Sequence, residues 1–127
     1  MNSRLSVNVS SEIGELQGVI LHTPGAEVEN MTPMDAHRAL YSDILNLEVA
    51  RKEYSQINGV LSKITRTYQI KDLLYEVVSK TKAKNQLIDT ICQHEGVLHL
   101  KEELANIPSK QLVNILIEGL PLKRNSL

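Results

Sequence analysis

The chain has 127 residues, of which 42% are hydrophobic and 23% charged, a composition typical of a soluble globular protein of one domain's size. Its net charge of −1 argues against a nucleic-acid partner, because binding phosphates requires a basic face. No apolar run reaches membrane-spanning length and no apolar signal core follows the first residues, so we expect no membrane partner and a cytoplasmic location.

The first predicted element is a β-strand over about residues 16–22. Its apolar run, Val19-Ile20-Leu21, lies between Gly18 and the turn Pro24-Gly25. A continuous apolar run of this length is typical of a strand that is covered on both faces.

Two helices are predicted next, over about 33–41 and 44–64. Thr32 and Pro33 form a typical helix start, because a threonine hydroxyl caps free amides and proline suits the first helical position. We interpret Asn58-Gly59 as part of the second helix, at a cost of about 1 kcal/mol for the glycine. The residues expected on the packed face of this helix are Ala50, Tyr54, Ile57, Leu61 and Ile64.

A second strand is predicted over about 65–70, where β-branched and aromatic residues predominate. A strand, a helix and a strand in succession place both strands in one parallel sheet. A sheet of two strands is not a complete layer, however, so residues 1–70 are expected to be one piece of a larger α/β fold.

Residues 71–127 carry only helical patterns and predict a small helical bundle, so the chain is mostly helical overall, α/β followed by α. Gly96 and Gly119 are expected to end helices, and Ser109 to cap the last one. The predicted apolar stripes are Leu73, Leu74, Val77 and Val78; Leu87, Ile88, Ile91 and Cys92; Leu98 with Leu104; and Leu112, Ile115 and Leu116.

Several ordered segments resemble the start of the arginine deiminase family. That family typically reads as a glycine-containing lead-in, then Leu-His-Arg-Pro-Gly, a Leu-Thr-Pro helix start, Leu-Leu-Phe-Asp-Asp and, later, Ile-Gly-Gly-Val/Leu. The matching segments here are Ser11 to Leu16, Val19 to Gly25, Glu27 to Pro33, Leu40 to Ile44, and Ile117 to Leu120. Their order along the chain makes the combination more specific than any one segment.

The resemblance implies a pentein fold, a five-bladed α/β propeller with a helical domain inserted early. Residues 1–70 would then be part of one blade, and residues 71–127 the inserted domain. In this family a cysteine thiolate attacks the guanidinium carbon of arginine, a histidine acts as general acid and base, and acidic side chains pair with the guanidinium nitrogens. Ammonia then leaves, and hydrolysis of the covalent adduct yields citrulline. The resemblance implies no cofactor.

The family's catalytic segments are absent from this chain: the Asn-x-x-Phe-Thr-Arg-Asp stretch, the Glu-and-His segment, the His-x-Asp motif and the carboxy-terminal cysteine. We therefore expect an amino-terminal fragment that is inactive by itself and whose partner is the remainder of the same polypeptide. L-arginine or another guanidino compound would be the substrate of the full-length protein. Unpaired strand edges also favour a homodimer.

Only two positions carry over to substrate binding. The resemblance places Leu40 in a lid that packs on arginine, and Asp43 at the second acidic position of the family's pair, where capping the following helix is the stronger interpretation. Thr23 stands where the family has Arg, and Ser42 replaces the first acid of the pair.

The remaining reactive side chains have plainer interpretations. Cys92 lies on an apolar helical stripe and is interpreted as a buried small hydrophobe, not as the nucleophile. No zinc spacing is present, so we expect no metal site, and His22 is expected to pack in the turn that follows the first strand. The other histidines, expected to be structural or in solvent, are His37, His94 and His99.

Two alternatives remain open. The first is a related guanidino-group enzyme such as an amidinotransferase, although the large helical insert favours the arginine deiminase branch. The second is a non-catalytic helical interaction module. An Asn-x-x-Phe-Thr-Arg-Asp stretch downstream in the gene would exclude the second alternative.

Overall fold

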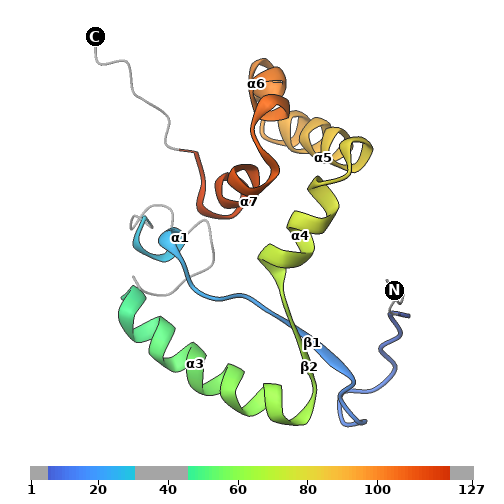
Figure 1. The fold of residues 1–127 in the computed structure, drawn as a ribbon, viewed down its shortest axis with the longest axis vertical. Helices are drawn as coiled ribbons and strands as arrows, with labels where there is room; N and C mark the ends of the chain where they lie inside the picture. The colour runs from blue at the N-terminus through green and yellow to red at the C-terminus, as the bar shows by residue number, and fades with distance from the viewer. Residues whose placement is uncertain (1–5, 31–45, 121–127) are drawn as a thin grey trace.

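The computed structural model describes residues 6–30 and 46–120. This part of the chain is mostly helical with one small sheet, as the sequence predicted, and the helix expected over 33–41 lies outside it (Figure 1). The elements in chain order are β1 (Gly18–Leu21), α1 (Ala26–Glu29), α3 (Leu47–Ile64), β2 (Arg66–Gln69), α4 (Ile70–Val78), α5 (Thr81–His94), the 3-10 turn η1 (Leu98–Leu100), α6 (Lys101–Asn106) and α7 (Ser109–Glu118).

The two strands form one parallel sheet, which confirms the predicted strand–helix–strand arrangement. Gly18 lies opposite Arg66 and Leu21 lies opposite Gln69. The described residues do not cover β1 on both faces, because Ile20 is 60% exposed. Among residues 6–30 and 46–120 the sheet has two strands only, and burial on both faces requires neighbouring strands and a second layer.

The start and the extent of helix α3 are explained by its sequence. The side-chain oxygen of Asn46 accepts a hydrogen bond from the amide of Val49 at 3.1 Å, which caps the helix. Glu48 in the first turn and Lys63 in the last turn have the charges that the helix dipole favours at those ends. Gly59 lies within the helix, which confirms the interpretation of Asn58-Gly59.

The packed face of α3 agrees with the predicted one at Ala50, Tyr54 and Leu61 and differs from it at two positions. Ile57 and Ile64 were expected on it but are 54% and 67% exposed. The sequence contains two apolar stripes on this helix, and periodicity alone does not decide which one faces the sheet. The half-buried residues of α3 are Leu47, Ala50, Tyr54, Asn58 and Leu61.

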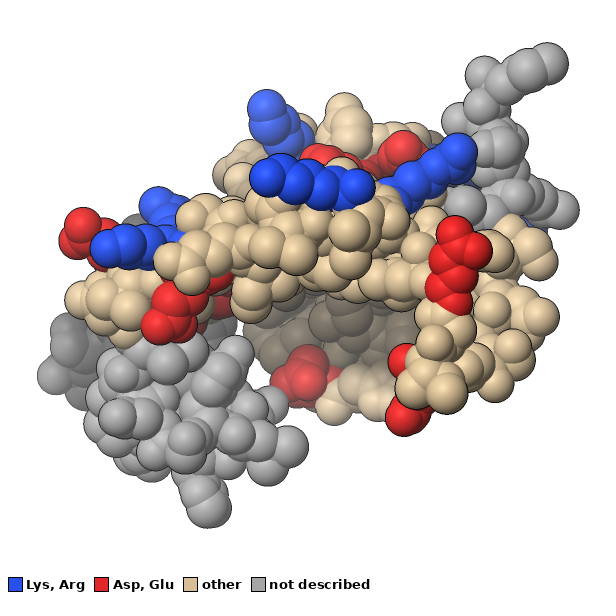
Figure 2. All heavy atoms as spheres, turned by 90° about the horizontal axis from the view of Figure 1, so that it is seen from below, with Lys and Arg blue, Asp and Glu red and all other residues tan. Residues whose placement is uncertain are grey.

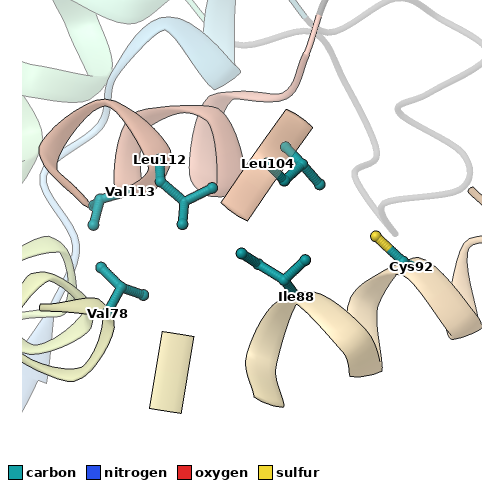
Figure 3. Packing of buried hydrophobic residues seen from close by; sticks show 6 residues of the cluster. All are labelled: Val78, Ile88, Cys92, Leu104, Leu112 and Val113. Atoms are coloured by element: carbon teal, nitrogen blue, oxygen red, sulfur yellow. The ribbon is translucent and has the colours of Figure 1, made fainter. Parts of the chain in front are cut away.

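Helices α4 to α7, residues Ile70–Glu118, enclose a core of their own and are called the helical unit below. Helix α4 packs against α5 and α7, and α5 packs against α6 (Figure 1). Figure 3 shows side chains from all four helices converging on this core. The buried members are Val78, Ile88, Cys92, Leu104, Leu112 and Val113.

The ends of these helices confirm the predicted glycines and correct two other expectations. Gly96 and Gly119 have φ of 67° and 90°, which suits glycine after a helix. Ser109 does not cap α7, because its hydroxyl donates to the carbonyl of Val78 at 3.1 Å and so ties α7 to the end of α4. Leu98 does not share the stripe of the buried Leu104, since it is 61% exposed on the short turn η1.

The short helix α1 packs between α3 and the helical unit. It contacts both α3 and α7, and its Val28 is buried. We call residues 18–69, which comprise β1, α1, α3 and β2, the strand–helix unit. Within it, Val28 is the sole buried hydrophobic side chain among the residues that the structure describes.

Candidate functional site

Polar side chains gather at one edge of the sheet, where both strands end. Because β1 and β2 are parallel, the residues that follow Leu21 lie beside the last residue of β2, Gln69. The carboxyl edge of parallel strands is where α/β proteins commonly bind ligands. We call this group the carboxyl-edge cluster. It comprises His22, Thr23, Gly25, Glu27, Arg51, Tyr54, Gln69, Lys71 and Glu118.

Gln69 joins three elements through its side-chain amide. The hydroxyl of Thr23 donates to Oε1 of Gln69 at 3.0 Å, and Nε2 of Gln69 donates to the Tyr54 hydroxyl at 2.5 Å. The end of β2 is thereby linked both to the segment after β1 and to α3. Thr23, which departs from the family's arginine, therefore has a specific partner here.

His22 and Glu27 close the turn after β1. The His22 Nε2 atom lies 2.5 Å from Oε1 of Glu27, and the amide of Gly25 donates to the same oxygen at 2.8 Å. A Cβ atom at Gly25 would lie 2.7 Å from Oε2 of Glu27, so any larger residue there would require the carboxylate to shift. The pair fixes the direction in which the chain leaves β1 and enters α1.

The environment of Glu27 favours its ionised form. Burial raises the pKa of its carboxyl, but hydrogen bonds from His22 and from the backbone amides of Glu27 and Gly25 lower it more, so the net pKa is below its ordinary value of 4.5. The carboxylate is therefore charged at neutral pH and acts as a fixed acceptor for His22 and Gly25.

Two further contacts brace the cluster against the surrounding helices. Nε of Arg51 on α3 donates to the carbonyl of Pro24 at 3.0 Å. Nζ of Lys71, at the start of α4, forms an ion pair of 2.7 Å with Glu118 at the end of α7. Glu118 also approaches the turn, since its Oε1 would lie 3.4 Å from a Cβ at Gly25. The turn thus lies against the end of α7.

The carboxyl-edge cluster supplies polar and charged side chains. It holds one imidazole, carboxylates and cations, but no thiol, because Cys92 is fully buried in the helical unit, as predicted for a small hydrophobe. Within residues 6–30 and 46–120 no three His, Cys, Asp or Glu side chains are grouped so as to hold a metal ion.

The substrate-contact positions expected from the sequence, Leu40 and Asp43, lie outside the described residues, as do His37 and Ser42. His94 and His99 are both exposed, at the end of α5 and on η1.

The partnership of His22 with Glu27 was not foreseen from the sequence, which suggested only packing in the turn. A histidine before Pro24-Gly25 and a glutamate two residues after that turn were the available signal. The side chains of these two residues come together only when the turn between them has formed.

The molecular surface carries charges of both signs. In Figure 2, Lys and Arg side chains lie mainly in the upper part of the view, and an uncharged surface extends below them with Asp and Glu at its margins. No helix in the part of the chain that the structure describes is long and apolar enough to cross a membrane.

Comparison with known proteins finds arginine deiminases among the relatives of this chain. An arginine deiminase from Lactococcus lactis subsp. cremoris is 34% identical over 134 residues, which cover 95% of this chain and 33% of that protein. One from Limosilactobacillus reuteri is 33% identical over 89% of this chain and 29% of its own length. One from Borreliella afzelii is 42% identical over 65% of this chain and 20% of its own length.

The resemblance inferred from the sequence segments is thereby confirmed. The chain spans about a third of the length of the first two relatives. No protein-family model matches the chain.

Proposed function

Since this chain is similar to arginine deiminases over nearly its whole length, we propose that it is the amino-terminal part of an arginine deiminase-type hydrolase. The full-length protein would convert arginine and water to citrulline and ammonia in the cytoplasm. The observation that carries the proposal is the 34% identity with the Lactococcus protein across 95% of this chain. The residues of this chain alone would supply neither the catalytic groups nor the complete substrate-binding site.

The role that we propose for the chain is to hold the segment that contacts substrate. Leu40 would pack on arginine, and Asp43 would cap the helix that follows or contact the guanidinium group. In the sequence this segment follows α1. The pairing of His22 with Glu27 fixes the start of α1, and the contact of Arg51 with Pro24 ties the turn to α3. The cluster would thereby anchor the segment on its amino-terminal side.

The proposed architecture follows the same division. The strand–helix unit would be part of one blade of a pentein propeller, and the helical unit the inserted domain. The open sheet supports this assignment, because β1 and β2 leave Ile20 largely exposed, as a sheet lacking further strands would.

A test of the proposal combines an activity assay with complementation. The 127-residue chain alone should form no citrulline from arginine above background. Mixing it with the Lactococcus lactis enzyme from which the matching third has been deleted should restore citrulline formation. Turnover by this chain alone would contradict the fragment assignment. Failure of complementation by this chain, where the deleted Lactococcus segment itself succeeds, would contradict the shared role.

A helical interaction module is the second candidate, favoured by one observation. The buried core lies almost entirely within the helical unit. The packing of this unit therefore does not require contacts with the sheet. The complementation assay separates the candidates, because a module with an unrelated role would restore no citrulline formation.

A further inference from the structure

The helical unit touches the strand–helix unit beside the turn after β1, where α7 contacts α1 (Figure 1). Glu118, the last residue of α7, approaches Gly25, the residue directly before α1. Val28 is the buried residue of α1, and it lies outside the core of the helical unit. A contact with one buried apolar side chain gains little from the hydrophobic effect, so it depends on its polar groups.

Two carboxylates converge at this contact. The position that a Cβ at Gly25 would take lies 2.7 Å from Oε2 of Glu27 and 3.4 Å from Oε1 of Glu118. Although burial raises the pKa of Glu27, hydrogen bonds from His22 and the backbone lower it below 4.5, so this carboxylate is charged at neutral pH. Two negative charges repel one another, and more strongly where water is partly excluded, so the contact requires a neighbouring cation.

Lys71 supplies that cation at the start of α4. Its Nζ lies 2.7 Å from Oε1 of Glu118, the same oxygen that approaches Gly25. The two side chains of the pair are only 31% and 28% exposed, so solvent screens their attraction less than it would on the open surface. His22 contacts Oε1 of Glu27, whereas Oε2 of Glu27 is buried without a hydrogen-bond partner among the described residues.

We propose that Lys71 is a counter-ion on which the contact between the two units depends. Its ammonium group neutralises Glu118 and so allows the end of α7 to lie beside the ionised Glu27. Loss of this charge leaves two carboxylates facing one another, and the end of α7 then moves away from the turn. The core of the helical unit stays packed, because it contains none of these residues. The proposal does not depend on the arginine chemistry, so its failure is distinct from failure of the proposed function.

Removing the two members of the pair should have unequal consequences. Lys71→Met keeps the aliphatic stem but leaves the charge of Glu118 unbalanced beside Glu27. Glu118→Gln instead removes one of the two repelling charges, and its amide can donate to Oε2 of Glu27, which lacks a partner among the described residues. An ordinary ion pair would be weakened about equally by either change, because each removes the same attraction.

Amide hydrogen exchange in the 127-residue chain measures how often the contact opens. The reporting amides are those of Gly25, which donates to Oε1 of Glu27, and of Val28, which donates to the Gly25 carbonyl at 3.1 Å. Lys71→Met should speed their exchange about tenfold, whereas Glu118→Gln should change it less than about twofold. The double variant should resemble Glu118→Gln, because the counter-ion is no longer needed once that carboxylate is absent.

Matched controls separate this effect from a general loss of stability. Lys71→Arg keeps the positive charge and should retain slow exchange at the turn. Asp89→Asn breaks the ion pair with Lys101, which joins α5 to α6 within the helical unit, and should leave exchange at the turn unchanged. The amide of Leu112 reports on the helical core and should exchange alike in the unchanged chain and in the Lys71 and Glu118 variants.

Three results would overturn the proposal. The first is exchange at the turn that Lys71→Met does not alter. The second is an equal effect of Lys71→Met and Glu118→Gln, which would indicate an ordinary ion pair. The third is faster exchange of the Leu112 amide in step with the turn, because the substitution would then have weakened the whole fold and not this contact.

Discussion

The helical unit and the strand–helix unit are built from the same aliphatic residue types but bury them to different extents. Six buried hydrophobic residues meet between α4, α5, α6 and α7, whereas the strand–helix unit contributes only Val28 among the described residues. The helices of the first unit cover one another on several sides. Among the described residues, the sheet of the second has α3 on one side and no further strand at either edge. Burial therefore follows from how many layers the chain supplies, and not from its hydrophobicity.

Separating the two units should have the largest effect. Residues 70–120 alone should retain helical circular dichroism and unfold in urea with a cooperative transition, because the core lies within them. Residues 1–69 alone should show no cooperative transition, since two strands and α3 do not form a stable layer by themselves. A cooperative transition in residues 1–69, or its loss in residues 70–120, would reverse the comparison.

A substitution in the core of the helical unit should have the next largest effect. Leu112 is fully buried, so Leu112→Ala should lower the free energy of unfolding by about 2–5 kcal/mol through lost packing and a residual cavity. Leu98→Ala removes the same atoms from an exposed position and should change that free energy by no more than about 0.5 kcal/mol. Urea denaturation of both variants measures the difference. Equal effects would mean that the helical core is not the principal source of stability.

The smallest effect concerns the carboxyl-edge cluster. Because the pKa of Glu27 is lowered in the folded chain, its contribution to stability is present above its ordinary pKa of 4.5 and is lost as pH falls through the lower folded value. His22→Ala removes a hydrogen bond to the carboxylate and should raise the pKa of Glu27. Titration of the Glu27 side-chain carboxyl by carbon-13 NMR measures both values. A pKa at or above 4.5 in the unchanged chain would show that the pair does not form.

The sequence was sufficient for those features that depend on local pattern. Helix α3 with Gly59 inside it, both strands, and the glycines after α5 and α7 all follow from periodicity and backbone preference. The buried position of Cys92 follows in the same way from its helical stripe.

Features that depend on tertiary contacts could not be predicted. The exposed Ile57 belongs to a second apolar stripe that is equivalent to the first in periodicity, so the choice between them requires the sheet. Ser109 has the residue type of a cap, but the carbonyl of Val78, distant in sequence, takes its hydroxyl. In the carboxyl-edge cluster, Thr23 and Gln69 are bonded only because the strands are parallel.

The parallel pairing of β1 with β2 has a consequence for the order of folding. Gly18 must meet Arg66 across an intervening chain that includes all of α3, whereas the contacts between α4 and α5 join near neighbours in sequence. Closing a long loop costs entropy before the pairing offsets it, and such distant contacts form slowly. The helical unit should therefore assemble first after dilution from denaturant. Strand β1 would be the last element to dock, because it stays unpaired until β2 has formed.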